Sequence, residues 1–296
     1  MKATYKSIII RTSLCVICAL SLSSCYGNLD VIGMVYGQSP RSDVRFEDSM
    51  HYNDSAGYKT LIIPEDEYLV YYSTDMHVDT NWNNLTTWSS AYRNDPDCYF
   101  AIILGDIINS INHYDEFMQG IAFNPETQAK DKPLFCTVGN HDLYYNQWAE
   151  YLKYWHTSTY YFIAQTPNYK DLFICMDSGD GTWGRKQFDW LKQLLAESAD
   201  ENYRHITLFT HTHIFKRDKS QGHTSNYTLE ETYEIMDILS RYNVEWYVSG
   251  HCHSRDVADY KGVKYIIVDT MEEPAEHPCY MIASFGKDIT YKFVDI

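Results

Sequence analysis

Five short polar stretches of this sequence carry side chains that bind metal ions or transfer protons. They are Asp75-Met76-His77, Gly105-Asp106-Ile107-Ile108-Asn109, Gly139-Asn140-His141-Asp142, Thr210-His211 and Gly250-His251-Cys252-His253. Each follows a short apolar run that predicts a buried strand, and these runs span residues 68–73, 99–104, 133–137, 206–209 and 244–248. Because sites in open α/β sheets lie where strands end, we expect the five stretches to form one site.

The residue types in these stretches suit a pair of divalent cations. A carboxylate can bridge two cations, and two-metal hydrolytic sites hold their ions roughly 3.5–4 Å apart. Asp, Asn and His donors favour Mn, Fe, Zn or Co over metals that select thiolates. Single pieces also have plainer interpretations: Asp75 and His77 could cap a helix, and His211 alone could be a core histidine. For Asn109, a turn and a contact to substrate or to the metal shell remain equally open.

Read in order, D-x-H, G-D-x-x-N, G-N-H-D, a single histidine after an apolar strand, and G-H-x-H resemble the five blocks of the calcineurin-like metallophosphoesterases. The resemblance spans residues 75–253 and implies a four-layer αββα sandwich. It assigns one metal to Asp75, His77, Asp106 and His253, and the other metal to Asp106, Asn140, His211 and His251. Asp106 is then the bridge. Purple acid phosphatases carry a metal-binding tyrosine where this chain has Asn109, so a tyrosinate–ferric centre is not expected.

These residues predict ester hydrolysis without a protein nucleophile. A hydroxide held by two metals forms near neutral pH and would attack phosphorus. His141 is the candidate general acid for the leaving oxygen, because a histidine pKa lies near the working pH. We expect Asp142 to hold that imidazole in place or to favour its charged form. For His213, a role close to the metals or substrate and plain surface exposure both remain open.

The cysteines after Cys25 predict buried free thiols rather than disulfides, because their number is odd and most lie in apolar runs. They are Cys98, Cys136, Cys175, Cys252 and Cys279. In an extended segment alternate side chains share one face, so His251 and His253 would face the metals and Cys252 would face away.

The first 24 residues are predicted to be an export signal and not part of the fold. Basic residues precede an apolar stretch at 14–22 that is too short to span a bilayer. The run Leu22-Ser23-Ser24-Cys25 is similar to a bacterial lipoprotein cleavage box, which implies a lipidated Cys25; an ordinary cleaved secretory peptide is the alternative. The protein would then be exported and membrane-anchored, in the outer membrane, periplasm or cell surface. We expect residues 25–60 to be a tether and irregular edge segment, and 61–296 to be the metal-binding domain.

Hydrophobic periodicity predicts the remaining elements. Helices are expected at 81–92, 111–120, 147–155, 184–198 and 228–242, the last with Leu229, Tyr233, Met236 and Leu239 buried. Strands are expected at 160–164, 172–176, 264–268, 279–284 and 290–294. Alternating elements followed by consecutive strands suit a mixed α/β fold of two packed sheets flanked by helices.

The composition of the chain narrows the class of substrate. The formal charge is −16, so the surface repels polyanions and argues against nucleic-acid polymers and a nuclease. Lys216, Arg217 and Lys219 could receive a phosphate, with a solvated loop as the alternative. We therefore expect a phosphoesterase for small phosphate mono- or diesters. The alternative is a non-catalytic, metal-containing surface binding lipoprotein.

Overall fold

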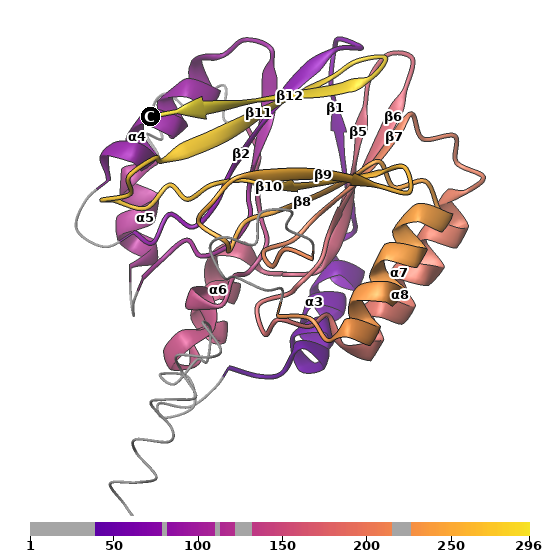
Figure 1. Ribbon diagram of the computed structural model, residues 1–296, viewed down its shortest axis with the longest axis horizontal. Coiled ribbons are helices and arrows are strands. Elements are labelled where there is room, and N and C mark those ends of the chain that lie inside the picture. The colour runs from indigo at the N-terminus through magenta and orange to yellow at the C-terminus, as the bar shows by residue number, and fades with distance from the viewer. Residues whose placement is uncertain (1–38, 79–81, 110–112, 122–131, 215–225) are drawn as a thin grey trace, which may run out of the picture.

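Two β-sheets form the centre of the computed structural model, which describes residues 39–78, 82–109, 113–121, 132–214 and 226–296 (Figure 1). The first sheet has the strand order β12-β11-β2-β3-β4. Its strands are β2 (Tyr68–Ser73), β3 (Cys98–Ile103), β4 (Leu134–Cys136), β11 (Cys279–Phe285) and β12 (Ile289–Asp295). β2 and β3 are almost continuously buried, as expected for strands that are covered on both faces.

The second sheet has seven strands in the order β1-β5-β6-β7-β8-β10-β9. They are β1 (Lys59–Ile62), β5 (Tyr160–Gln165), β6 (Lys170–Cys175), β7 (His205–Phe209), β8 (Trp246–Ser249), β9 (Asp256–Tyr260) and β10 (Val263–Ile267). β6, β7 and β8 are parallel neighbours, and β5 pairs antiparallel to β6.

Helices cover the outer face of each sheet (Figure 1). The five-stranded sheet packs against α4 (Asn83–Asn94), α5 (Tyr114–Gly120) and α6 (Trp148–Trp155). The seven-stranded sheet packs against α7 (Gly184–Ser198) and α8 (Leu229–Arg241). A third apolar cluster fills the space between the sheets, with Phe100 and Phe135 on one side and Phe162 and Phe173 on the other. Three apolar interfaces between four layers confirm the predicted αββα sandwich.

Parallel strands bring the predicted site together. β2, β3 and β4 are parallel in one sheet, and β7 and β8 are parallel in the other. Each of the five polar stretches follows the carboxyl end of one of these strands, so the stretches meet at one edge of the sandwich.

Helix α3 (Ser42–Ala56) lies in the segment for which we expected a tether without regular structure, and that expectation is wrong from residue 42 onward. Its buried face is polar and consists of Ser42, Arg45, Ser49 and Asn53. Arg45 is fully buried and forms a bidentate pair with Asp177, both bonds at 2.8 Å. Apolar periodicity could not reveal this helix, because hydrogen bonds and an ion pair hold it against the sheet.

Two other details differ from the sequence predictions. β1 and β9 were not predicted, and both are edge strands with partly exposed side chains. Leu229 and Tyr233 of α8 are 62% and 63% exposed, so they do not form its buried face. Ile235, Ile238 and Leu239 do, at the i, i+3, i+4 spacing of a helical stripe.

The five cysteines at 98, 136, 175, 252 and 279 are buried and free, as predicted. Within the described residues, no helix is both long and apolar enough to cross a membrane. The predicted signal, Cys25 and the basic cluster at 216–219 lie outside the described residues.

Candidate metal centre

Backbone hydrogen bonds join four of the five site loops in pairs. The N–H of Asp75 donates to the Gly105 carbonyl at 3.1 Å, and the N–H of His77 donates to the Asp106 carbonyl at 3.1 Å. The N–H of Gly250 donates to the His211 carbonyl at 2.9 Å. Ligands from both sheets are therefore positioned by main chain as well as by side chains.

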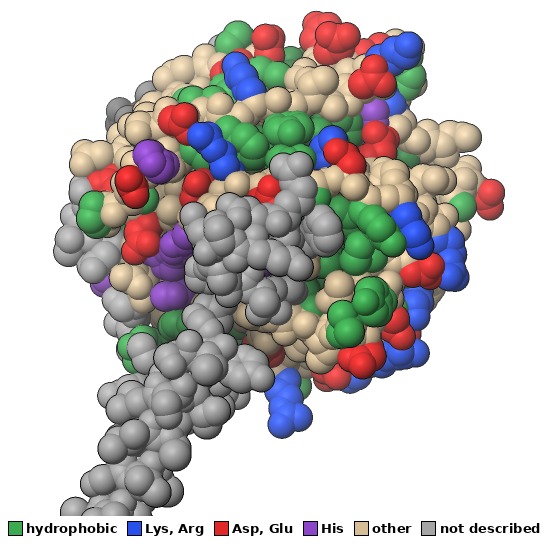
Figure 2. All heavy atoms as spheres, in the orientation of Figure 1, with side chains coloured by type: hydrophobic (Ala, Val, Ile, Leu, Met, Phe, Trp, Pro, Cys, Tyr) green, Lys and Arg blue, Asp and Glu red, His purple; other side chains and the backbone are tan. Residues whose placement is uncertain are grey.

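One group of donors consists of Asp75, His77 and His253, whose ligand atoms lie within 4.8 Å of one another. The Nε2 atoms of His77 and His253 face each other at 3.2 Å. The Asp75 Oδ1 atom lies 3.3 Å from His253 Nε2. Asp75 and His77 are buried, while the His253 side chain is 39% exposed, so the site opens to solvent at this residue. Figure 2 shows histidine side chains gathered on one face of the molecule.

A second group consists of Asp106, His211 and His251. His211 Nδ1 donates to the Leu104 carbonyl at 2.8 Å, which leaves its Nε2 lone pair for a metal. That Nε2 atom lies 3.1 Å from both Asn140 Oδ1 and His251 Nδ1. Asn140 thus presents its amide oxygen to the same point.

Asp106 connects the two groups. Its Oδ2 atom lies 3.3 Å from His211 Nε2 and 3.8 Å from His77 Nε2, so one oxygen faces both sets of donors. Its Oδ1 atom accepts the backbone N–H of His141 at 2.8 Å. This is the geometry that a bridging carboxylate requires.

The carboxylates and the histidines of the site shift one another's pKa values. Burial would raise the pKa of Asp75, but the neighbouring His253 lowers it below its usual value. Burial would lower the pKa of His253, but the neighbouring Asp75 raises it to about 9. For His211, burial also lowers the pKa, and the Asp106 carboxylate raises it to about 9. Burial and the His211 charge lower the pKa of His251 to about 3. The buried carboxylates thus require positive charge beside them.

The donor set fits divalent cations. Asp75 Oδ1 is buried and accepts no hydrogen bond from the described residues, and it faces His253 Nε2 at 3.3 Å. The facing imidazole nitrogens lie 3.1 and 3.2 Å apart. Ligand nitrogens about 2.0–2.1 Å from a tetrahedral zinc would lie about 3.3 Å apart. Lone pairs at this spacing repel one another unless a cation or proton lies between them.

The backbone at the ligands is in an unusual conformation. Five candidate ligands have a positive φ: Asp75 (47°), His77 (44°), Asp106 (51°), His251 (67°) and His253 (46°). Left-handed backbone is uncommon for residues other than glycine and is concentrated at functional sites. His251 and His253 thus both reach the site, but not through the extended alternation that we assumed.

Two motif glycines are required by close approach. A Cβ at Gly139 would lie 2.1 Å from Asp106 Oδ1 and 2.3 Å from the Asp106 backbone nitrogen. A Cβ at Gly250 would lie 1.8 Å from Thr74 Oγ1 and 2.7 Å from Asp75 Oδ2. Any side chain at these positions would displace a candidate ligand.

His141 lies at the edge of this cluster. One of its ring nitrogens is within 4.8 Å of ligand atoms of His77 and Asp106, and its ring packs edge-on against His77 at 4.3 Å between centroids. Its Nδ1 atom is buried and has no hydrogen-bond partner among the described residues. Tyr144 lies beside it, with ring centroids 4.5 Å apart, and the Tyr144 hydroxyl accepts from Asn140 Nδ2 at 2.9 Å.

Asp142 does not take the position that we expected. It is fully buried, and its carboxylate accepts the backbone N–H groups of Asp106, Gly139 and Ile107 at 2.9, 2.9 and 3.1 Å. It also accepts the Tyr114 hydroxyl at 3.2 Å. Burial and the Asp106 charge raise its pKa to about 7. Asp142 therefore joins two ligand loops through their backbone, and among the described residues it makes no hydrogen bond that would hold the His141 imidazole in place.

The other candidate residues lie at the periphery. Asn109 is exposed, and its backbone N–H donates to the Val78 carbonyl at 3.3 Å. His213 is buried rather than exposed, with its ring 6.1 Å from the His251 ring. Cys252 is buried and lies outside the ligand groups found among the described residues.

Sequence reasoning missed two neighbours of the ligands. Asn226 Nδ2 lies 3.2 Å from His251 Nε2, and Glu272 Oε2 lies 3.6 Å from His253 Nδ1. Both belong to loops without a recognisable motif, so only the fold brings them to the site.

Comparisons with known proteins agree with this fold. A sequence model of the calcineurin-like phosphoesterases matches residues 69–255, and no curated protein matches the chain. Among solved structures, Plasmodium GAP50, described as the anchor in the inner membrane complex, is similar with a TM-score of 0.58 and 15% identity, over 78% of this chain and 85% of that one. A purple acid phosphatase from yellow lupin has a TM-score of 0.60 and 12% identity, over 79% of this chain and 52% of that one. The chain thus spans about half of the lupin enzyme. At these identities the likeness shows the fold alone.

Proposed function

The chain belongs to the calcineurin-like phosphoesterase family, whose sequence model matches more than half of it, and we propose that it is a metal-dependent hydrolase of small phosphate esters. The observation that carries the proposal is the position of His141 beside a complete donor set. A nitrogen of His141 lies within 4.8 Å of ligand atoms of His77 and Asp106.

The residues that would hold two cations are the donors described above. Asp75, His77 and His253 would hold one, Asn140, His211 and His251 would hold the other, and Asp106 would be shared. Two such cations would supply charge that clamps the phosphoryl oxygens and would make water acidic enough to react near neutral pH.

The chain's own contribution is proton transfer and positioning. His141 is partly exposed, and it lies close enough to the ligands to meet the leaving oxygen of an ester bound there. It would donate its proton to that oxygen as the ester bond breaks. Its backbone N–H donates to Asp106, so the acid and the bridging carboxylate keep a fixed relation.

A small ester fits the charge of the molecule better than a polymer does. The chain carries −16, and Figure 2 shows acidic and basic side chains interspersed on the visible face rather than segregated. A long polyanion would find no continuous basic track on that face, and it would be repelled by the overall charge.

The test is release of nitrophenol from mono- and bis-nitrophenyl phosphate, with and without added Mn²⁺. His141→Ala should lower kcat by about 100-fold or more, as loss of a general acid does, while the bound metal is retained. His277→Ala is the matched control, because that side chain is 76% exposed and carries no predicted role. Equal, metal-independent background in the parent and in His141→Ala would refute the enzymatic proposal.

The second candidate is a non-catalytic surface protein that keeps the metal site for binding. Its support is the likeness to a protein described as a membrane-complex anchor, at an identity that shows only the fold. Turnover of the metal-loaded protein, with its metal content checked by elemental analysis, separates the two. Stoichiometric metal without turnover on any phosphate ester would favour the binding protein.

We also propose that the protein is exported and anchored in a membrane through a lipid on Cys25. The support is the sequence Leu22-Ser23-Ser24-Cys25 after a basic and apolar leader. Labelled palmitate should be incorporated into the parent and not into Cys25→Ser. Labelling of both variants, or of neither, would contradict the anchor.

A further inference from the structure

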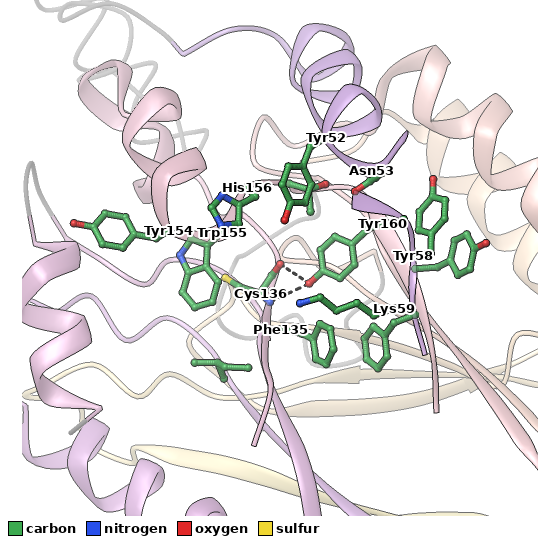
Figure 3. Close-up of a pocket in the computed structure, with 15 residues that line it drawn as sticks. Tyr52, Asn53, Tyr58, Lys59, Phe135, Cys136, Tyr154, Trp155, His156 and Tyr160 are labelled. Atoms are coloured by element: carbon green, nitrogen blue, oxygen red, sulfur yellow. Dashed lines mark hydrogen bonds between the residues drawn. The ribbon is translucent and has the colours of Figure 1, made fainter. Parts of the chain in front are cut away.

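A pocket of about 280 Å³ lies away from the candidate ligands, at an open side of the sandwich (Figure 3). Its lining comes from the ends of α3 and α6 and from strands β1, β4 and β5. β1 is an edge strand of the seven-stranded sheet and β4 is an edge strand of the five-stranded sheet, and no further strand of the described residues closes the space between them at this side. None of the candidate metal ligands lines it.

The walls of the pocket are flat and fixed. The Tyr52 ring stacks on His156 at 5.1 Å between centroids, and Phe135 stacks on Phe162 at 3.7 Å. Tyr160 is held by both backbone polar groups of Cys136: its hydroxyl accepts the N–H at 3.0 Å and donates to the carbonyl at 2.9 Å. Aromatic walls that are already ordered lose little entropy when a flat ligand binds.

The described residues that line the pocket supply one lysine. Among the described residues that line it are Lys59 and His156, but no Asp or Glu. Figure 3 shows the Lys59 side chain reaching from β1 into the pocket, with its ammonium group directed toward Cys136. Its Nζ atom lies 5.8 Å from the centre of the Phe135 ring. Among the described residues, no carboxylate oxygen lies within 4.0 Å of that ammonium group.

We propose that this pocket binds a planar aromatic carboxylate. The ring would lie against the aromatic walls, and the carboxylate would pair with Lys59. A volume of about 280 Å³ is near the lower end of small-ligand sites, which run from about 300 to 1,000 Å³, so one or two fused rings would fill it. The inference is independent of the proposed hydrolase activity, because the pocket and the metal centre share no residue.

Calorimetric titration with 2-naphthoate tests the proposal, with 2-naphthamide as its neutral analogue. We use chelator-treated full-length protein, because a carboxylate could otherwise bind a metal, and repeat the titration with saturating inorganic phosphate. One naphthoate should bind in both conditions and should bind about tenfold more tightly than the amide, the effect of one charge-assisted hydrogen bond. Loss of binding under either condition would assign the carboxylate to the metal centre and overturn the proposal.

Lys59→Met should remove the preference for the acid over the amide, because it keeps the apolar stem and removes the charge. Lys192→Met is the matched control: that lysine also lies over an aromatic ring, Phe188 at 4.2 Å, but on α7. Tyr52→Leu should weaken acid and amide alike through loss of stacking. Binding that is absent in the parent, equal for acid and amide, or unchanged in Lys59→Met would refute the site. The last result would mean that Lys59 only covers the edge of the core.

Discussion

Replacement of Asp142 separates two roles that the sequence could not distinguish. If Asp142 orients His141, its removal should lower turnover and leave stability unchanged. The structure instead shows its carboxylate accepting three buried backbone N–H groups and one tyrosine hydroxyl. We therefore predict that Asp142→Ala destabilises the metal-free fold.

The magnitude follows from the donors that lose their partner. An unsatisfied buried polar group costs about 1–3 kcal/mol, and some of this is recovered if water enters. Three amides thus give a loss of about 3–6 kcal/mol, against a typical total stability of about 5–15 kcal/mol. Asp142→Asn should cost less, about 1–3 kcal/mol, because its oxygen can still accept from Asp106 and Gly139 while its NH₂ opposes the N–H of Ile107.

The assay is urea unfolding of chelator-treated protein, followed by tryptophan fluorescence and extrapolated to water. The expected order of stability is parent, Asp142→Asn, Asp142→Ala, and His141→Ala should stay close to the parent. A variant Asp142→Ala that unfolds like the parent but has the turnover of His141→Ala would refute the bracing role. That result would indicate instead that Asp142 orients the His141 imidazole.

Three further predictions test the surroundings. Gly139→Ala should abolish metal binding, because its Cβ would contact the bridging aspartate. Gly262→Ala is the control, because Gly262 has a φ of +83° but lies in open space. It should lower the stability by only about 1–2 kcal/mol and leave the bound metal unchanged in elemental analysis. Tyr144→Phe should weaken metal affinity in chelator competition about tenfold, because the amide ligand loses the hydroxyl that orients it, and an unchanged affinity would contradict this. The Nδ1 atom of His205 contacts the Glu245 carboxylate, and its Nε2 atom contacts the Gly286 carbonyl. Burial lowers the pKa of His205, but these two partners raise it above 6.5. The contribution of the protonated His205 to stability is present in full below pH 6.5 and is lost as pH rises through its pKa in the folded state. In urea unfolding, Glu245→Gln should therefore lower the stability by about 0.5 kcal/mol more at pH 6 than at pH 9.

The parts of the fold that apolar patterns encode were predictable from the sequence. The strands β2, β3, β7 and β8 and helix α7 lie where the apolar runs placed them, within one or two residues. The predicted buried face of α8 was shifted around the helix: Leu229 and Tyr233 share the helical spacing but are exposed, and the buried face is formed by Ile235, Ile238 and Leu239. Hydrophobic periodicity indicates which face of a helix is apolar, but the element that packs against the helix determines which residues of that face are buried.

The sequence did not allow us to predict which polar side chains are buried or which partners they have. Helix α3 buries Arg45 through its pair with Asp177, which follows β6 and lies far from Arg45 in the sequence. Asp142 was misjudged for a similar reason. Its neighbour in the sequence is His141, but the tight turn of residues 141–146 directs the two side chains to different partners.

The site residues could be named from the sequence because their types are those of a metal centre. The positions of their side chains, however, depend on a backbone conformation that the sequence does not predict. Five of the candidate ligands lie in left-handed backbone, and such residues cost of order 1–3 kcal/mol each. The neighbouring loops sustain this conformation: the Asp75 and His77 amides donate to the loop that carries Asp106, and Asp142 holds that loop to Gly139. Strain and buried negative charge are thus concentrated at one point. A cation bound there would relieve the charge, which is why the same residues that destabilise the metal-free fold give it affinity for metal.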